Sequence, residues 1–250
     1  MCAPALSEAA TAALAAEAVE VVAGSGGLLL ISEHAGNRVP APWRSLGLAP
    51  ALLDTHFAWD VGAGALTRLL AQRLAAPAVC GAYSRLFLDL NRFPGDWDCL
   101  RPDLGGIPVP ANLAPSEEER ALRERIAREP FDRAVGEALG DRRTVISVHS
   151  FTPLSEGRRR RTEIGVLWRQ EGKLGPAFLA SLRQAGQFVV GDNDPYDWRQ
   201  GEGYSLRRHG LDRDLPCLYL ELRNDLLASE AGRERMAEAL LPALTAAAIA

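Results

Sequence analysis

The sequence predicts an α/β fold, a three-layer sandwich around a mixed, mostly parallel central sheet. Apolar runs of strand length alternate along the chain with longer segments whose apolar residues recur at helical spacing. Polar and charged residues directly follow several of the apolar runs, as expected where strands end at the crevice of an open sheet. A chain of 250 residues can bury one sizeable core, so we expect a single domain over residues 1–250.

The individual elements follow from the same patterns. Strands are predicted at 28–32, 77–80, 86–90, 144–149, 163–168, 187–190 and 217–222. Helices are predicted at 5–20, 60–74, 117–138, 175–184 and 228–248, with Asp60 as a helix cap and a break at Pro130. Between 93 and 116 prolines and glycines are dense and no period survives, which is typical of an irregular segment that carries function.

Composition excludes several classes of protein. A net charge of −4 argues against a nucleic-acid surface, which needs a clear cationic excess. No apolar run approaches the ~20 residues that span a bilayer, and the first residues lack the pattern of a signal peptide. Four cysteines at spacings that fit no metal knuckle indicate reduced thiols. We therefore expect a soluble, cytoplasmic protein without nucleic-acid or membrane partners; the sequence indicates no oligomeric state.

Two histidines stand where predicted strands end, His34 after the run at 28–32 and His149 at the end of 144–149. Each alone is more commonly a hydrogen-bonded loop residue. Charged and amide residues also end the predicted strands at 86–90 and 217–222, so all of these groups are expected to share one pocket. Imidazoles, carboxylates and arginines together suit a Zn²⁺ ion and a carboxylated substrate.

Five motifs then carry a resemblance. They are EHAGNRVP at 33–40, HFAWDVGA at 56–63, YSRLFLDLNR at 83–92, VHSF at 148–151 and ELRND at 221–225. Their joint order, over roughly residues 28–226, resembles the N-formylglutamate amidohydrolase family, whose fold is similar to that of the zinc carboxypeptidases. The resemblance implies one Zn²⁺ per chain, with His149 as a ligand, Glu221 as the catalytic glutamate, and Asn91 and Arg92 on the substrate carboxylate.

The sequence departs from the carboxypeptidase pattern at the second ligand. Those enzymes have a glutamate three residues after their first histidine, but three residues after His34 this chain has Asn37, a poor zinc ligand. We take Asp60 as the missing carboxylate, because the formylglutamate family has an aspartate in this region. Glu33 is the rival, although adjacent residues that leave a strand tend to point to opposite faces. Asp60 as a mere helix cap remains an alternative.

Further residues are candidates for binding the substrate. By period two, Arg85 lies on the same face as Asp89 and could join Arg92. In the basic run 158–161, Arg161 is the best placed to cover a second carboxylate, because it stands next to a predicted strand. Arg223 of the ELRND motif and Tyr204, in a loop that could close over a small substrate, complete the set. His56 and His209 are expected outside the ligand set.

The predicted function is zinc-dependent hydrolysis of an N-acyl acidic amino acid, and N-formyl-L-glutamate is the substrate that the resemblance implies. Two alternatives remain open. One is a deacylase or carboxypeptidase-like hydrolase of another N-acyl amino acid or small peptide. The other is a metal-free binding protein on the same fold, which Asn37 would favour.

Overall fold

The structure is a computed structural model and describes residues 6–169, 174–198 and 203–249. Its strands are β1 (Val19–Val22), β2 (Leu28–Ser32), β3 (Ala78–Gly81), β4 (Thr144–Phe151), β5 (Leu154–Ser155), β6 (Arg158–Arg159), β7 (Ile164–Leu167), β8 (Val190–Asp192) and β9 (Cys217–Arg223). Its helices are α1 (Glu8–Ala16), α2 (Ala63–Leu74), α3 (Glu117–Arg123), α4 (Glu129–Leu139), α5 (Leu174–Ala185), α6 (Tyr204–His209) and α7 (Glu230–Ala247).

Seven strands form one sheet in the order β1-β3-β2-β4-β9-β7-β8. The central strands β3, β2, β4 and β9 are parallel to one another, whereas β1 and β7 pair antiparallel with β3 and β9. Strands β5 and β6 form a separate two-stranded sheet. The carboxyl ends of the four central strands therefore meet at one edge of the sheet, where ligand sites of open α/β sheets lie.

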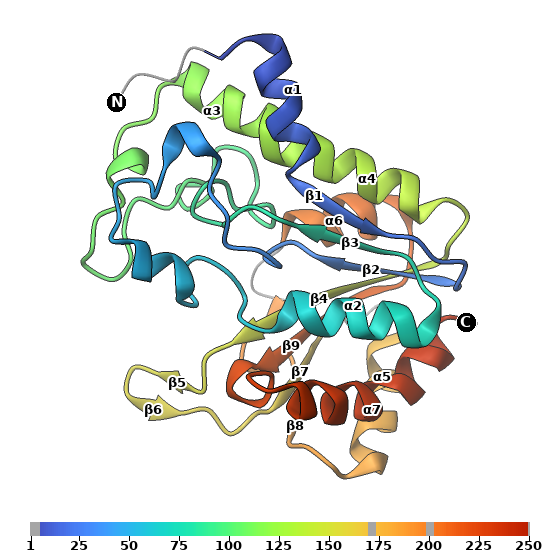
Figure 1. The fold of residues 1–250 in the computed structure, drawn as a ribbon. Coiled ribbons are helices and arrows are strands. Elements are labelled where there is room, and N and C mark those ends of the chain that lie inside the picture. Colours follow the sequence, from blue (N-terminus) through green and yellow to red (C-terminus); the bar gives the residue numbers. More distant parts are fainter. Residues whose placement is uncertain (1–5, 170–173, 199–202, 250) are drawn as a thin grey trace.

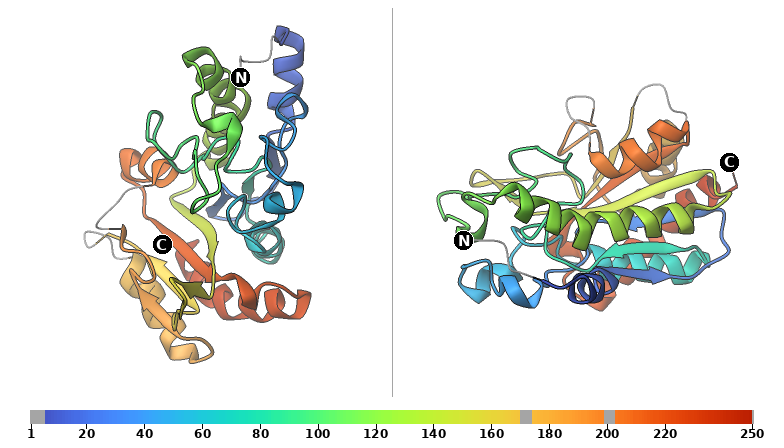
Figure 2. Two further views of the ribbon diagram at one scale, coloured as in Figure 1. Left: turned by 90° about the vertical axis from the view of Figure 1, so that its left-hand side faces the viewer. Right: turned by 90° about the horizontal axis from the view of Figure 1, so that it is seen from above.

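Helices cover both faces of the sheet, so the molecule has three layers. Helices α2, α5 and α7 lie against one face, and α4 lies against the other (Figure 1). Seen from above, α3 and α4 form one long helix across that second face (Figure 2). The central strands carry apolar side chains on both faces, as buried parallel strands do; all five residues of β2 are buried. The predicted fold class is confirmed.

Local sequence explains several element boundaries. The serines at positions 7, 116 and 229 cap α1, α3 and α7, each accepting a hydrogen bond from the backbone N–H three residues on. Helix α2 begins after Gly62, which has a φ of +85°. A Cβ at that position would lie 2.5 Å from the Cβ of Leu227, so only glycine suits this turn.

Four sequence expectations need correction. The run 86–90 forms turns instead of a strand, because the side chains of Ser84 and Asp89 accept backbone N–H groups that a strand would pair with a neighbour. Helix α1 ends at Ala16, and the alternating residues that follow form the edge strand β1. The helix does not break at Pro130, which lies in the first turn of α4 after a π-helical turn. Asp60 does not cap α2 with its side chain.

No helix among the described residues is both long enough and apolar enough to span a membrane.

Candidate metal and amidohydrolase site

His34, Asp60 and His149 lie together at the carboxyl edge of the sheet. His34 follows β2, Asp60 precedes α2, and His149 is in β4. The Nδ1 atom of His149 lies 2.9 Å from Asp60 Oδ2, and the Nδ1 atom of His34 lies 3.5 Å from the same oxygen. The backbone N–H of Asp60 donates to the carbonyl of His34, which ties the two loops together. All three side chains are buried.

A carboxylate lies against the far nitrogen of each imidazole. His34 Nε2 is 2.7 Å from Asp89 Oδ1, and His149 Nε2 is 3.1 Å from Glu33 Oε2. Glu33 also accepts a hydrogen bond from Ser147. Histidine ligands of metals commonly make this contact through the nitrogen that does not bind the ion, because the carboxylate fixes the ring and raises its basicity. The arrangement therefore turns the Nδ1 atoms of both rings towards Asp60.

The residues fit a divalent cation. One donor atom from each of His34, Asp60 and His149 can be chosen so that all lie within 4.8 Å of one another. Among the described residues, the buried Nδ1 atom of His34 has no hydrogen-bond partner. Two imidazoles and a carboxylate are a ligand set of catalytic zinc sites, which keep a further position for water or substrate. Glu33 contacts Nε2 of His149, on the side of the ring away from Asp60. The geometry therefore favours Asp60 over Glu33 as the third donor.

The pKa shifts within the cluster also favour a bound cation. Burial by itself would raise the pKa of Asp60, but the charges and hydrogen bonds of His34 and His149 outweigh it and lower that pKa. Burial would likewise lower the pKa of His149, but Glu33 and Asp60 raise it well above its usual value. The carboxylates thus stabilise positive charge between them, and a bound cation would supply it in place of the imidazole protons.

Arg85 closes one side of the cluster. Its Nε and Nη2 donate to Asp89 Oδ2 at 2.9 and 2.7 Å, and its Nη1 lies 3.3 Å from Asp60 Oδ1. Burial would lower the pKa of Arg85, but Asp89 and Asp60 outweigh burial and raise that pKa above its usual value. Arg85 is therefore part of the site, but two aspartates already share its charge.

Glu221 is the partner of His149 in the parallel register of β4 and β9. It is buried, and its Oε2 atom has no hydrogen-bond partner among the described residues. Burial, opposed by the charge of His149 and reinforced by that of Asp60, raises the pKa of Glu221 to about 7. A carboxylate with such a pKa can accept and return a proton near neutral pH.

Asn91 and Arg92 follow Asp89 and lie beside the cluster with other partners. The Oδ1 atom of Asn91 accepts from the hydroxyl of Tyr219 at 3.1 Å and from the backbone N–H of Ser205 at 3.2 Å. Arg92 is more exposed, and its Nε lies 3.0 Å from a carboxylate oxygen of Asp98. In this structure both side chains therefore have partners outside the cluster.

The structure does not bring the other candidates into the cluster. The hydroxyl of Tyr204 donates to Asp132 of α4 at 2.7 Å. Arg223, at the end of β9, pairs with Glu163 and Asp225. Arg161 is exposed. Of the remaining histidines, His209 also contacts Asp132, so Tyr204 and His209 both tie α6 to α4.

The sequence places Asp89 only on the same face as Arg85, and it does not single out Arg160 or Tyr196. Asp89 is bound to His34, a contact that the strand predicted at 86–90 could not reveal. Arg160 and Tyr196 contact each other, with Nη1 of Arg160 3.2 Å from the tyrosine hydroxyl. The basic run 158–161 was the available signal for Arg160; in the structure Arg160 is half-buried and contacts Tyr196, whereas Arg161 is exposed.

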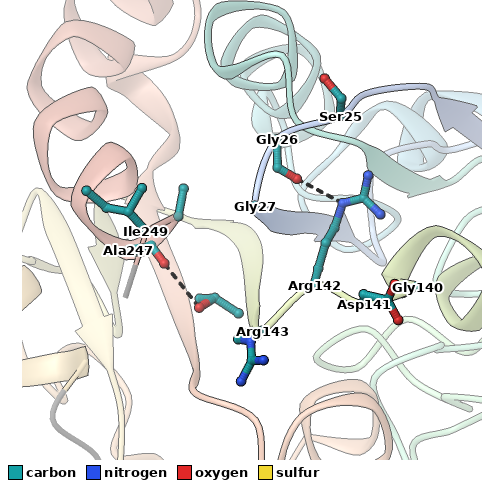
Figure 3. Close-up of a pocket in the computed structure, with 11 residues that line it drawn as sticks. Ser25, Gly26, Gly27, Gly140, Asp141, Arg142, Arg143, Ala247 and Ile249 are labelled. Carbon is teal, nitrogen blue, oxygen red and sulfur yellow. Dashed lines mark hydrogen bonds between the residues drawn. The ribbon is translucent and has the colours of Figure 1, made fainter.

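A separate hollow lies at the opposite edge of the sheet, before β2 and β4 (Figure 3). It has a volume of about 730 Å³ and is open to solvent. The side chain of Arg142, which lines the hollow, already donates hydrogen bonds to the backbone carbonyls of Gly24 and Gly26 at 2.7 and 2.9 Å. We assign the chemistry to the carboxyl edge, where the titratable groups converge.

Comparisons with known proteins show the family of this chain. Residues 26–228 match the family model of N-formylglutamate amidohydrolase. A solved structure of a gene product from Agrobacterium tumefaciens shares 35% sequence identity, with 92% of this chain and 94% of that chain covered and a TM-score of 0.87. N-formylglutamate amidohydrolase from Ralstonia eutropha has the same fold at 18% identity, with 93% of this chain and 98% of that chain covered and a TM-score of 0.70. No curated protein was found to match.

The family match spans most of the chain, and it includes all the residues of the cluster described above. The resemblance seen in the five motifs is confirmed. The chain therefore belongs to the N-formylglutamate amidohydrolase family and is a hydrolase that acts on an amide bond.

Proposed function

We propose that this protein hydrolyses the amide bond of an N-acyl acidic amino acid, with N-formyl-L-glutamate as its substrate and one Zn²⁺ per chain. The observation that carries the proposal is the buried group of His34, Asp60 and His149 beside Glu221, a carboxyl whose pKa is raised to about 7. Family membership supports the choice of substrate. When bound, zinc polarises the amide carbonyl and lowers the pKa of water.

Glu221 is proposed as the general base. It is the register partner of His149, and the charges of His149 and Asp60 act on its carboxyl, which supports a role beside the proposed metal ligands. It takes a proton from the attacking water and delivers it to the nitrogen of the leaving amino acid, so one carboxylate serves both steps. Burial keeps bulk water from competing for that proton.

The substrate's carboxylates require cationic or amide donors. We propose that Arg92 and the side-chain NH₂ of Asn91 hold the α-carboxylate, since the oxygen of that amide is already occupied. Arg92 exchanges its contact with Asp98 for the substrate in this step. Arg85 keeps Asp60 and Asp89 in place and contributes positive potential at the carbonyl.

The test combines metal analysis with hydrolysis. Zinc-loaded protein, dialysed to remove loose metal, is expected to hold about one zinc per chain and to release formate from N-formylglutamate; a His34→Ala variant should lose both. Faster hydrolysis of N-acetylglutamate or of a dipeptide would assign the chain to another deacylase or carboxypeptidase-like class. A parent protein that retains no zinc after loading would favour a metal-free binding protein.

A further inference from the structure

Arg160 is held between two aromatic rings beside the candidate site. Its guanidinium carbon lies 5.3 Å from the ring centroid of Phe151 and 5.2 Å from that of Tyr196. The two rings are nearly perpendicular to each other. Contacts of this kind attract a cation to the ring face and restrict its side chain. The backbone carbonyl of Arg160 also accepts a hydrogen bond from Arg223, so both parts of the residue are fixed.

Among the described residues, the side-chain hydrogen bonds of Arg160 use one edge of its guanidinium. Its side-chain bonds to the described residues both use Nη1, at 3.4 Å from the carbonyl of Thr152 and 3.2 Å from the hydroxyl of Tyr196. The other edge, Nε with Nη2, is the pair of donors that binds a carboxylate with two parallel bonds. Because the Tyr196 hydroxyl accepts from Arg160, its own proton remains available to a second oxygen of the same ligand.

The arginines near the site also differ in their ion pairs. Arg85 is shared by Asp60 and Asp89, and Arg92 pairs with Asp98. In the part of the chain that the structure describes, no carboxylate forms an ion pair with Arg160, although the residue is half-buried. A partly desolvated cation without a counterion favours an anionic ligand.

The strand register places Arg160 close to the reacting centre. His149 and Phe151 are two residues apart in β4, so their side chains leave the same face of the sheet about 7 Å apart. Glu221 and Arg223 occupy the matching positions in β9. Burial and the charge of Glu221 raise the pKa of Tyr196, against the lowering effect of Arg160, which places that hydroxyl within the field of Glu221. Arg160 therefore lies one step beyond His149 along the same face.

From these contacts we infer that Arg160, clamped by Phe151 and Tyr196, binds the side-chain carboxylate of the substrate and so selects acidic over neutral N-acyl amino acids. The inference rests on the proposed function. It replaces Arg161 with its neighbour as the specificity-determining residue of the basic run. It also explains why Phe151 and Arg223 follow His149 and Glu221 at the same register: they position the arginine that reads the substrate.

The experiment compares N-formyl-L-glutamate with N-formyl-L-glutamine, which has the same shape without the charge. The zinc-loaded parent should prefer the glutamate by kcat/KM. Arg160→Gln should lower kcat/KM for the glutamate by about 10- to 100-fold, the range of a charge-assisted contact, and change it little for the glutamine. Arg160→Lys should recover part of the loss. Arg158→Gln, an exposed arginine of the same run, is the matched control and should keep the parent's preference.

Two results would overturn the inference. One is an equal loss on both substrates in folded Arg160→Gln, and the other is loss of the preference in Arg161→Gln instead. A parent that hydrolyses N-formyl amino acids without favouring the acidic one would also contradict it, while leaving the amidohydrolase function intact. If the parent hydrolysed neither compound, the proposed function would fail; calorimetry of N-formylglutamate binding to the parent and to Arg160→Gln then decides whether Arg160 holds the carboxylate.

Discussion

Glu221 and His149 are direct partners in the register of two neighbouring parallel strands, β9 and β4. One strand thus carries the proposed base and the next a proposed metal ligand, so their separation is set by the backbone and not by flexible loops. Asp60 completes the arrangement from the start of α2, where Gly62 allows the chain to turn. Sites built on rigid elements hold reacting groups more precisely than sites on loops.

The first prediction concerns the third metal ligand. Asp60→Asn should lose zinc, because it removes the carboxylate that lies between the Nδ1 atoms of His34 and His149. Glu33→Gln should retain zinc with an affinity reduced by about 10- to 100-fold, as expected for a residue that orients a ligand. Zinc titration of both variants against a chelator measures the difference. Retention by Asp60→Asn together with loss by Glu33→Gln would transfer the ligand role to Glu33.

The pH dependence of hydrolysis follows from Glu221. Because burial raises its pKa to about 7, the carboxyl becomes protonated as the pH falls through that value and can no longer accept a proton from water. We expect kcat/KM to rise with pH to a plateau. A cation beside Glu221 would favour the charged form and shift the rising limb to lower pH. A pH–rate profile of the zinc-loaded enzyme with an optimum in acid and a fall towards pH 7 would contradict this assignment.

Arg123 should be a major contributor to stability. It is fully buried, pairs with Glu119 at 2.7 Å, and donates to Asn112 and to the carbonyls of Phe87 and Ala111. Arg123→Met leaves the buried carboxylate of Glu119 without its cation, although Trp43 still donates to it, and should lower the free energy of unfolding by about 3–5 kcal/mol.

The matched control is Arg125→Met in the same helical segment. Arg125 pairs with the exposed Glu8, and surface pairs of this kind contribute roughly 0–1 kcal/mol. Urea unfolding of both variants measures the two costs. If Arg123→Met and Arg125→Met lowered the free energy of unfolding equally, the buried Arg123 would contribute no more to stability than the exposed Arg125.

The cysteines are expected to be unreactive in the folded protein. Burial raises the pKa of Cys80 and of Cys99 to about 12, so almost no thiolate is present at pH 8. Iodoacetamide at pH 8 should leave both residues unmodified in the native protein and alkylate them in urea, as followed by peptide mass mapping. Rapid native alkylation of Cys99 would show that the segment between 93 and 116 opens readily.

The sequence predicted the regular part of the fold well and the irregular part poorly, for physical reasons. Apolar runs in the sequence predict the central strands, and the positions of His34 and His149 at strand ends follow from those runs. The run at 86–90 is equally apolar but is buried in turns that Ser84 and Asp89 stabilise locally, a preference that hydrophobicity does not encode. Strand β1 was missed because its four residues include one charge and are only partly buried.

The candidate site, like the fold, includes residues that strand ends predict and contacts that they do not. Glu221 lies at the carboxyl edge expected for the end of a strand, and Arg85 lies beside the predicted ligands. The contacts of Tyr204 with Asp132, and of Arg160 with Tyr196, join segments far apart in the chain, so only the folded structure could reveal them. The choice between Arg160 and Arg161 depends on the direction of a single side chain, which a run of four arginines leaves open.

Glu221→Gln tests the central claim most directly. Glutamine keeps the size of the side chain but cannot accept the proton of water, so the variant should retain zinc, bind N-formylglutamate with the parent's affinity, and lose turnover by roughly 10²- to 10⁴-fold. Zinc content, calorimetry of substrate binding and steady-state rates on the same preparation provide the comparison. Turnover near the parent rate in the zinc-loaded variant would contradict the account, because Glu221 would then not be the base.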